Sequence, residues 1–356
     1  MNPLLAQITA IVSRVGRSET CRERHTRRWN RNQRHEERSS FRRTRMATEL
    51  DESAPRGLLE FSAEQQTVEI GGVRVGGQPG VLPTVLIGSI FYHGHKIFID
   101  EDRDEFDREQ AAKRIRLQED FAQRTGNPGM LDVVGATPEA LQKHLEFAAS
   151  ITKMPLLIDG TTTDVRLAGL KYVAEVGLAD RVVYNSIQPE IDDGELAAIR
   201  EAGVECVLAL TYYLKDFTAK GRVQAVRELL PRVREAGIRK LIVDTCVMDL
   251  ATMGQACSAI FDVKDEFGLP CGGGVHNAVA MWRGLKSKMG EQAEKPCVAS
   301  ACAAAVAVGA DFVLYGPIED AKYVFPAVAM VDTALSQLVM EKGGRPDENH
   351  PRFRIG

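Results

Sequence analysis

The chain has 356 residues, of which 44% are hydrophobic and 26% charged, values typical of a soluble globular protein with a sizeable core. Its formal net charge of −4 hides an uneven distribution, because residues 1–45 contain twelve Arg and four Glu but no Lys or Asp. That segment therefore carries a charge of +8, and the remainder of the chain carries −12.

The Arg-rich segment 1–45 is predicted to be a disordered extension. After Val15 it has almost no apolar periodicity, so it cannot bury enough surface to offset the entropy that ordering costs. Its apolar patch from Leu4 to Val15 precedes the basic run, the reverse of a secretory signal, and its four Glu argue against an organellar transit peptide. A nucleic-acid-binding arm is one alternative. We favour a dispensable extension with the working start at Met46, and expect no nucleic-acid partner.

The cysteines and the apolar runs exclude several classes of protein. Seven cysteines without CxxC spacing, mostly in apolar surroundings, predict reduced and buried thiols in a cytoplasmic protein, with neither a metal finger nor a disulfide framework. The longest apolar run, residues 297–308, falls short of the roughly 20 residues that span a bilayer. We therefore expect no transmembrane segment, and a buried helix of small residues at this position.

From Pro83 onward, strand-like and helix-like segments alternate, which indicates a parallel sheet. Residues 67–75 precede them and alternate around a Gly-Gly pair, which predicts a hairpin that plugs one end of a barrel. Thr137-Pro138 indicates a helix start, and Gly177, Gly203 and Gly237 indicate helix ends. Eight strands are predicted, at Thr84–Phe91, Leu131–Val134, Leu156–Asp159, Val182–Asn185, Cys206–Thr211, Lys240–Asp244, Leu269–Gly273 and Phe312–Gly316.

This rhythm predicts a (β/α)8 TIM barrel over residues 60–341, followed by a C-terminal tail at residues 342–356. A doubly wound open sheet is the alternative, although no glycine fingerprint follows the first strand to support a dinucleotide site. Residues 93–106 are polar, follow the first strand and should form a long loop at the carboxyl end of the barrel.

Polar residues end several of the predicted strands, where a barrel of this kind holds its active site. They are Asp132, Asp159, Asn185 and Asp244, and Asn277 follows a glycine run after the seventh strand. Any one of them could merely cap a helix or shape a turn. Together, carboxylates and amides suit a flat heterocycle with mixed donors and acceptors, such as a pterin, although the spacing does not separate pterins from purine-like ligands.

Other residues near these strand ends have alternative interpretations. The run Gly272-Gly273-Gly274 allows positive φ or close approach of a ligand, and a phosphate-binding loop is its competing explanation. His276 could act as an acid or base, although a lone histidine is more often structural. His93 and His95 have a spacing that could bind a metal, but no third ligand lies nearby in the sequence, so we expect no metal site.

Many ordered motifs resemble the H-subunit family of tetrahydromethanopterin S-methyltransferase and its soluble relatives over roughly residues 60–340. They include Val68-Glu69-Ile70-Gly71-Gly72-Val73, Thr84-Val85-Leu86-Ile87-Gly88-Ser89-Ile90-Phe91-Tyr92, Thr125-Gly126-Asn127-Pro128, Leu131-Asp132-Val133-Val134-Gly135, Ile158-Asp159-Gly160-Thr161-Thr162, Tyr184-Asn185-Ser186-Ile187 and Gly274-Val275-His276-Asn277.

The resemblance implies a methyltransferase that moves a methyl group between a partner corrinoid (cobalamin) protein and N5 of tetrahydrofolate or tetrahydromethanopterin. It also implies that Asp159, Asn185 and Asp244 hold the pterin ring, with Asp132 as a further ring ligand, and that Asn277 addresses N5. A homodimer is left open. The Arg- and Ala-rich composition favours tetrahydrofolate, with methyl groups taken from a quaternary amine. A dihydropteroate-synthase-like enzyme and a non-catalytic subunit of a methyltransferase complex are the alternatives.

Overall fold

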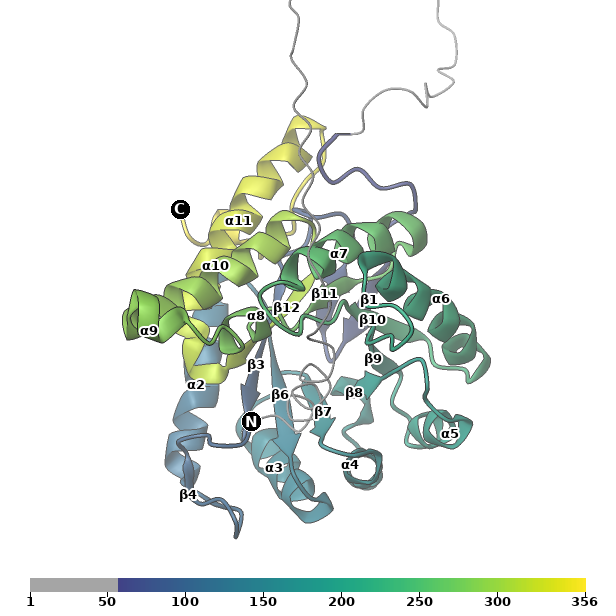
Figure 1. The fold of residues 1–356 in the computed structure, drawn as a ribbon, viewed down its shortest axis with the longest axis vertical. Coiled ribbons are helices and arrows are strands. Elements are labelled where there is room, and N and C mark those ends of the chain that lie inside the picture. The colour runs from purple at the N-terminus through teal and green to yellow at the C-terminus, as the bar shows by residue number, and fades with distance from the viewer. Residues whose placement is uncertain (1–56) are drawn as a thin grey trace, which may run out of the picture.

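The computed structural model describes residues 57–356, so the predicted extension at 1–45 lies outside the described residues. Eight parallel strands close into a barrel in the order β10-β11-β12-β3-β6-β7-β8-β9, and the helices surround it (Figure 1). The predicted (β/α)8 barrel and its eight strands are confirmed. The strands are β3 (Val85–Ile90), β6 (Gly129–Gly135), β7 (Leu156–Gly160), β8 (Val182–Ile187), β9 (Cys206–Leu210), β10 (Lys240–Asp244), β11 (Cys271–Gly273) and β12 (Phe312–Pro317).

The helices begin and end at residues suited to those positions. Thr137 caps α3 by accepting a hydrogen bond from the Ala140 N–H, as its sequence predicts. Gly177, Gly203 and Gly237 follow α4, α5 and α6 with φ values of 70°, 73° and 80°. The barrel helices are α2 (Arg108–Thr125), α3 (Pro138–Ile151), α4 (Thr163–Glu175), α5 (Asp193–Glu201), α6 (Ala219–Glu235), α7 (Met253–Phe267), α10 (Glu294–Ala307) and α11 (Ala321–Glu341).

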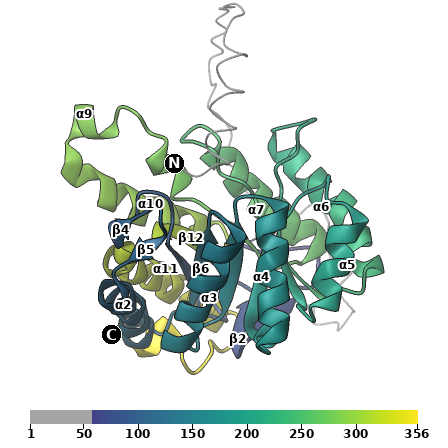
Figure 2. The same cartoon turned by 90° about the horizontal axis from the view of Figure 1, so that it is seen from below.

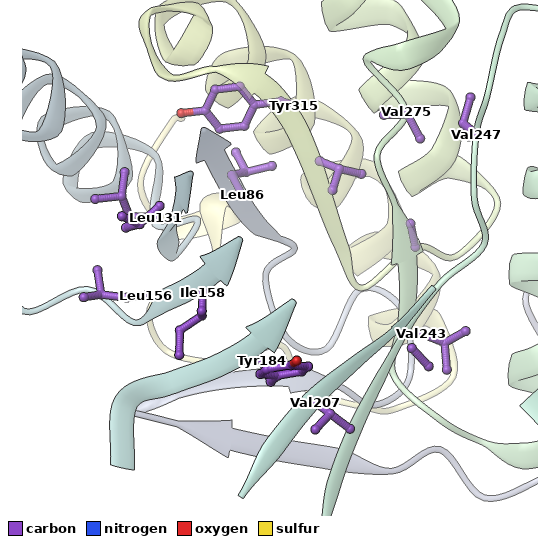
Figure 3. Close-up of a cluster of buried hydrophobic side chains, with 14 of the residues drawn as sticks. Leu86, Leu131, Leu156, Ile158, Tyr184, Val207, Val243, Val247, Val275 and Tyr315 are labelled. Carbon is purple, nitrogen blue, oxygen red and sulfur yellow. The ribbon is translucent and has the colours of Figure 1, made fainter. Parts of the chain in front are cut away.

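Alternation along the strands produces two apolar clusters, one on each side of the barrel wall. Side chains that point outward pack beneath the helices in one large cluster, part of which Figure 3 shows. Its labelled members come from seven of the strands and two loops: Leu86, Leu131, Leu156, Ile158, Tyr184, Val207, Val243, Val247, Val275 and Tyr315. A smaller cluster fills the barrel interior with residues that include Ile87, Leu157, Val183, Leu208 and Ile242.

A hairpin closes the amino end of the barrel, as predicted. It consists of β1 (Thr67–Ile70) and β2 (Val73–Gly76), an antiparallel pair beneath the barrel strands (Figure 2). Ile70 and Val75 belong to the interior cluster, so the hairpin completes the core from below. Buried Lys264 of α7 contacts the Asp311 carboxylate at 2.6 and 2.7 Å and donates to the Gly77 carbonyl at 3.2 Å, which ties the hairpin to the barrel.

The long loop after β3 is present and contains a small hairpin of β4 (Phe98–Asp100) and β5 (Glu105–Phe106). His144 of α3 is stacked on Phe91 with ring centroids 4.0 Å apart, and its Nε2 lies 2.8 Å from Asp104 Oδ1. His95 Nε2 lies 3.4 Å from Glu319 Oε2 in the turn after β12. The loop is therefore attached to the barrel at two points.

The chain after α11 returns beneath the barrel. The Asp347 N–H donates to the Val81 carbonyl at 2.8 Å, and the Asp347 carboxylate pairs with Arg74 of the plug hairpin. His350 is fully buried, and burial lowers the pKa of its imidazole to about 4. The predicted tail is thus packed against the plug and the last helix.

Two helices, α10 and α11, pack side by side (Figure 1), and they carry no exposed charged residue over residues 296–307 and 323–340. The small-residue helix expected at 297–308 forms within α10, but only one side of it is buried, since Ser300 and Ala304 are exposed. On α11, Met330 is 62% exposed. Of the described helices, Ile318–Glu341 alone is long and apolar enough to cross a membrane by length and composition, and it packs against the barrel as its last helix.

Candidate active site

The barrel interior changes from apolar to polar at its carboxyl end. Residues two positions apart on a strand point the same way, so the residues two positions after the interior apolar layer also face the lumen. Ile87, Met130, Leu157, Val183 and Ile242 belong to the apolar layer. The corresponding next residues, which we call the polar layer, are Ser89, Asp132, Asp159, Asn185 and Asp244.

Asp132 is the centre of a hydrogen-bonded group that comes from strands β3, β6 and β8. Its Oδ2 accepts from the Ser89 hydroxyl at 2.7 Å, and its Oδ1 accepts from the Asn185 amide at 3.1 Å. Burial raises the pKa of Asp132 to about 6, although both hydrogen bonds favour the charged form. The structure therefore brings together two of the predicted site residues, Asp132 and Asn185.

Asp159 lies on β7, the strand next to the β6 strand that carries Asp132, and it is partly exposed at the mouth. Burial, and then repulsion from Asp132, raises the pKa of its carboxyl well above the usual value, while Arg166 acts in the opposite sense. Two such carboxyls readily take up a proton or bind groups that donate hydrogen bonds.

Asp244 lies across the lumen at the end of β10. Its Oδ1 accepts from the Cys246 N–H at 2.7 Å, and its Oδ2 accepts from the Gly274 N–H at 3.0 Å. Burial raises the pKa of Asp244 to about 6, against the effects of these two bonds and of the charge of Arg222. The carboxylate plane is thus fixed by two backbone donors, and each oxygen keeps a lone pair for a ligand.

Asn277 is the first residue of the short helix α8 (Asn277–Ala280) and is linked to the loop after β10. Its Nδ2 donates to the Val247 carbonyl at 3.1 Å. A Cβ added at Gly274 would lie 3.3 Å from Asn277 Nδ2 and 3.7 Å from Asp244 Oδ2, so both side chains lie against this glycine. Asp244 and Asn277 therefore form one part of the site, and Asp132, Asp159 and Asn185 form another.

The glycine run 272–274 allows close packing and does not adopt a left-handed backbone. None of Gly272, Gly273 and Gly274 has positive φ, so the run does not use the backbone freedom that its glycines allow. Close approach is the reason for glycine at the first two positions. A Cβ at Gly272 would lie 2.0 Å from the Phe312 carbonyl oxygen, and one at Gly273 would lie 2.9 Å from Asp244 Oδ1. The run therefore makes room for β12 and for the Asp244 carboxylate.

The histidines near the mouth make structural contacts. His276 donates through Nδ1 to the Leu314 carbonyl at 3.0 Å, and burial lowers the pKa of its imidazole, which favours the neutral form. It also lies against Gly316, where an added Cβ would be 2.6 Å from the ring. His93 Nδ1 lies 2.7 Å from Glu101, whereas His95 faces Glu319, so the two imidazoles that could have shared a metal bind different carboxylates.

Two residues of the site were not predicted from the sequence. Ser89 lies two residues after Ile87, so the same alternation that places Asp132 in the lumen could have identified it. Arg222 of α6 is 2% exposed and binds the loop after Asp244, and no local pattern in the sequence indicates this contact.

The arrangement as a whole suits a planar ligand rich in N–H donors. Carboxylates at Asp132, Asp159 and Asp244 offer acceptors on two sides of the lumen, and the amides of Asn185 and Asn277 offer both functions. Burial disfavours the charged forms of these carboxylates, and donors on a bound ligand would compensate for that cost.

Comparisons with known proteins identify the family. The model for the family described as tetrahydromethanopterin S-methyltransferase MtrH subunit matches residues 63–346. The H-subunit of tetrahydromethanopterin S-methyltransferase from Methanothermobacter thermautotrophicus is 38% identical over 309 residues, which cover 84% of this chain and 100% of that protein. The H-subunit of the putative methyltransferase mtx from Methanosarcina barkeri is 38% identical over 306 residues, which cover 83% and 98%.

Solved structures of dihydropteroate synthases share the fold. Yersinia pestis DHPS in complex with a pterine-sulfa conjugate aligns with a TM-score of 0.54 and 16% identity, covering 76% of this chain and 99% of that one. The Xanthomonas albilineans enzyme aligns with a TM-score of 0.51 and 17% identity, covering 75% and 97%. At such identity the likeness shows the barrel alone. The family match confirms the resemblance inferred from the motifs, and the chain therefore belongs to the MtrH family, a family of methyltransferases.

Proposed function

We propose that this chain transfers a methyl group between a methyl-corrinoid protein and N5 of a tetrahydropterin. The observation that carries the proposal is the polar layer itself, in which three buried or partly buried carboxylates, one amide and one hydroxyl face one lumen, with the Asn277 amide beside Asp244. The 2-amino group and adjacent ring N–H of a pterin form a donor pair that matches one carboxylate. The relatives are named as methyltransferase subunits, and one of them is named for tetrahydromethanopterin, which supports methyl transfer and a tetrahydropterin substrate.

Within this proposal, Asp159, Asn185 and Asp244 hold the ring, Asp132 is a further ring ligand that also orients Asn185, and Asn277 faces N5. Asp244 is the strongest candidate for the donor pair of the ring, since both of its oxygens are already oriented by backbone N–H groups. The Asn277 amide uses one N–H on Val247 and keeps its oxygen and second N–H for a nitrogen whose protonation changes during the reaction.

The corrinoid supplies or accepts the methyl group as a Co–CH3 bond on a separate protein. Transfer to the pterin requires the N5 lone pair to form the N–C bond while the Co–C electron pair stays on cobalt and N5 loses its proton. The protein contributes mainly by holding N5 in line at the open mouth, and such positioning can supply roughly 7–11 kcal/mol.

Tetrahydrofolate and tetrahydromethanopterin share the ring that the polar layer would bind, so both are candidate substrates. The relatives are named for tetrahydromethanopterin. The Arg- and Ala-rich composition favours tetrahydrofolate, with a quaternary amine as the original source of the methyl group. The six described cysteines are free, which supports a cytoplasmic location.

The outer faces of α10 and α11, which carry no exposed charge over residues 296–307 and 323–340, support a second copy of the chain as a further partner. Between Lys322 and Glu341 the only charged residue of α11 is Asp332, which is buried, while Tyr323 and Met330 are exposed. An apolar face of this kind is self-complementary across a twofold axis. Met330→Glu should convert a dimer to a monomer in light scattering, and a monomeric wild-type protein would contradict this part of the proposal.

An anaerobic spectroscopic assay tests the function. Purified protein is mixed with methylcobalamin and either tetrahydrofolate or tetrahydromethanopterin, and the cobalamin spectrum is followed. Demethylation with one pterin identifies the substrate. If neither pterin reacts, even with a methyl-corrinoid protein in place of free methylcobalamin, but pterin binding is measurable, a non-catalytic subunit is favoured. Condensation of a pterin pyrophosphate with an aromatic amine would indicate a dihydropteroate-synthase-like enzyme instead.

A further inference from the structure

We infer that Arg222 is a positioning residue that fixes Asp244 and Asn277 together by binding the loop between them. The inference rests on the function proposed above, in which Asp244 binds the donor pair of the pterin ring and Asn277 faces N5. Arg222 belongs to α6, on the outer side of the barrel wall. Its hydrogen bonds go to backbone carbonyls and not to the side chains of Asp244 or Asn277.

The guanidinium of Arg222 is a buried clamp on the loop after β10. Its Nε donates to the Thr245 carbonyl at 2.6 Å, and its Nη2 donates to the Cys246 carbonyl at 3.0 Å. Its Nη1 donates to the carbonyls of Phe217 and Thr218 at the start of α6. A planar fork can satisfy all these carbonyls at once, which an ammonium group cannot do with the same geometry.

The loop that Arg222 binds also holds the two site side chains. The N–H of Cys246 donates to Asp244 Oδ1, and the carbonyl of Val247 accepts from Asn277 Nδ2. Cys246 has a φ of 58°, in the left-handed region that residues other than glycine rarely adopt. Arg222 binds the carbonyl of this same residue, so the unusual backbone that aims its N–H at Asp244 is held from the opposite side.

The charge of Arg222 adds a second effect on Asp244. Burial raises the pKa of the Asp244 carboxyl, and the guanidinium is the charged group that acts against this rise. Other titratable groups also interact with Arg222 and Asp244. The thiols of Cys246 and Cys271 interact with Asp244, and Cys246, Asp216 and Asp249 interact with Arg222. Burial raises the pKa of Cys246 to about 12 and that of Cys271 well above its usual value, so both thiols stay neutral at physiological pH.

Removal of the charge and removal of the fork should therefore have separable effects. Arg222→Met removes both, whereas Arg222→Lys keeps the charge and loses the fork. Arg227→Met serves as the matched control, because Arg227 lies on the same helix but is exposed and pairs with Glu266. Tetrahydropterin affinity is measured by calorimetry from pH 5 to pH 9 together with the single-turnover rate of methyl transfer, and melting temperatures verify folding.

In the wild type, affinity should decrease as the pH falls through the Asp244 pKa, because the protonated carboxyl loses an acceptor. In Arg222→Met this decrease should begin at higher pH, by at least about half a pH unit, since loss of a nearby opposite charge raises a carboxyl pKa. In Arg222→Lys the pH dependence should stay close to wild type while the transfer rate falls by at least about tenfold. Arg227→Met should match the wild type in both measurements.

A ligand-free measurement separates this inference from the proposed function. The carboxyl carbon-13 resonance of Asp244, assigned by its loss in Asp244→Asn, should titrate at higher pH in Arg222→Met than in Arg222→Lys. If wild-type protein binds no tetrahydropterin, the proposed function is wrong, whatever the titration shows. If the wild type binds and Asp244→Asn removes the pH dependence, but Arg222→Met lowers only the melting temperature, Arg222 is merely structural and the inference is overturned.

Discussion

Replacement of Asn277 with alanine should slow methyl transfer far more than it weakens pterin binding. The Asn277 amide is oriented by one hydrogen bond to the Val247 carbonyl, so its free oxygen and N–H are preorganised at the mouth. Loss of one preorganised donor at a site of changing charge costs roughly 2.7–4 kcal/mol of barrier. We expect the low end, about 100-fold, because Asn277 is partly exposed and water can replace part of its contribution.

Single-turnover demethylation of methylcobalamin with saturating tetrahydropterin measures the rate, and calorimetry measures the affinity. Asn277→Ala should bind the pterin within a few-fold of the wild type. Asn277→Asp is the matched variant, since it keeps the acceptor oxygen but replaces the N–H that binds Val247. A normal transfer rate in Asn277→Ala would show that the residue only forms the turn into α8. An equal loss of rate and affinity would make it a ring ligand and refute the separation of roles.

The remaining predictions concern the ring ligands, the plug and the amino-terminal segment. Asp244→Asn should weaken tetrahydropterin binding about 10- to 150-fold in calorimetry, because the new amide turns an NH2 donor toward donors of the ring, at a cost of roughly 1.5–3 kcal/mol. This loss of affinity should exceed the loss caused by Asp132→Asn. Wild-type affinity in Asp244→Asn would remove Asp244 from the site. Burial raises the pKa of the Asp132 and Asp244 carboxyls to about 6, so tetrahydropterin affinity should be fully present above that pH and should decrease below it. An affinity that stays constant from pH 5 to 8 would contradict this prediction. Lys264→Met should lower the free energy of unfolding, measured by urea titration, by roughly 3–5 kcal/mol, because it leaves the buried Asp311 carboxylate without its ion-pair partner. An unchanged urea midpoint would mean that Asp311 takes up a proton at little cost. Deletion of residues 1–45 should leave the melting temperature and methyl transfer unchanged, and a loss of several degrees would show that this segment contributes to the fold.

The strands were predictable because each is an apolar run between helix signals, and their ends differ from prediction for local reasons. The seventh strand was expected to begin at Leu269, but its ladder begins at Cys271, since Pro270 has no N–H to donate. The polar layer was predictable from the same alternation. Ser89 was missed because its run reads as continuously apolar around one small hydroxyl.

Contacts between distant segments could not be predicted. Arg222 binds carbonyls 23 and 24 residues away, and nothing in the surrounding helix distinguishes it from an exposed arginine. The orientation of α10 was equally hidden. A helix composed mainly of small uncharged residues has no polar face that indicates which side points outward, so its exposed Ser300 and Ala304 were expected to be buried.

The hairpin plug has a kinetic consequence. β1 and β2 seal the amino end, and Ile70 and Val75 fill the lumen there. Asp159 and Asn185 of the polar layer are partly exposed, so solvent reaches the layer from the carboxyl end. A protein docked there to deliver a methyl group would cover that entrance. The proposed reaction must then follow a compulsory order, with the pterin entering first and leaving last. Pterin held beneath a saturating carrier protein should exchange slowly with free pterin, and excess carrier added before the pterin should inhibit the reaction.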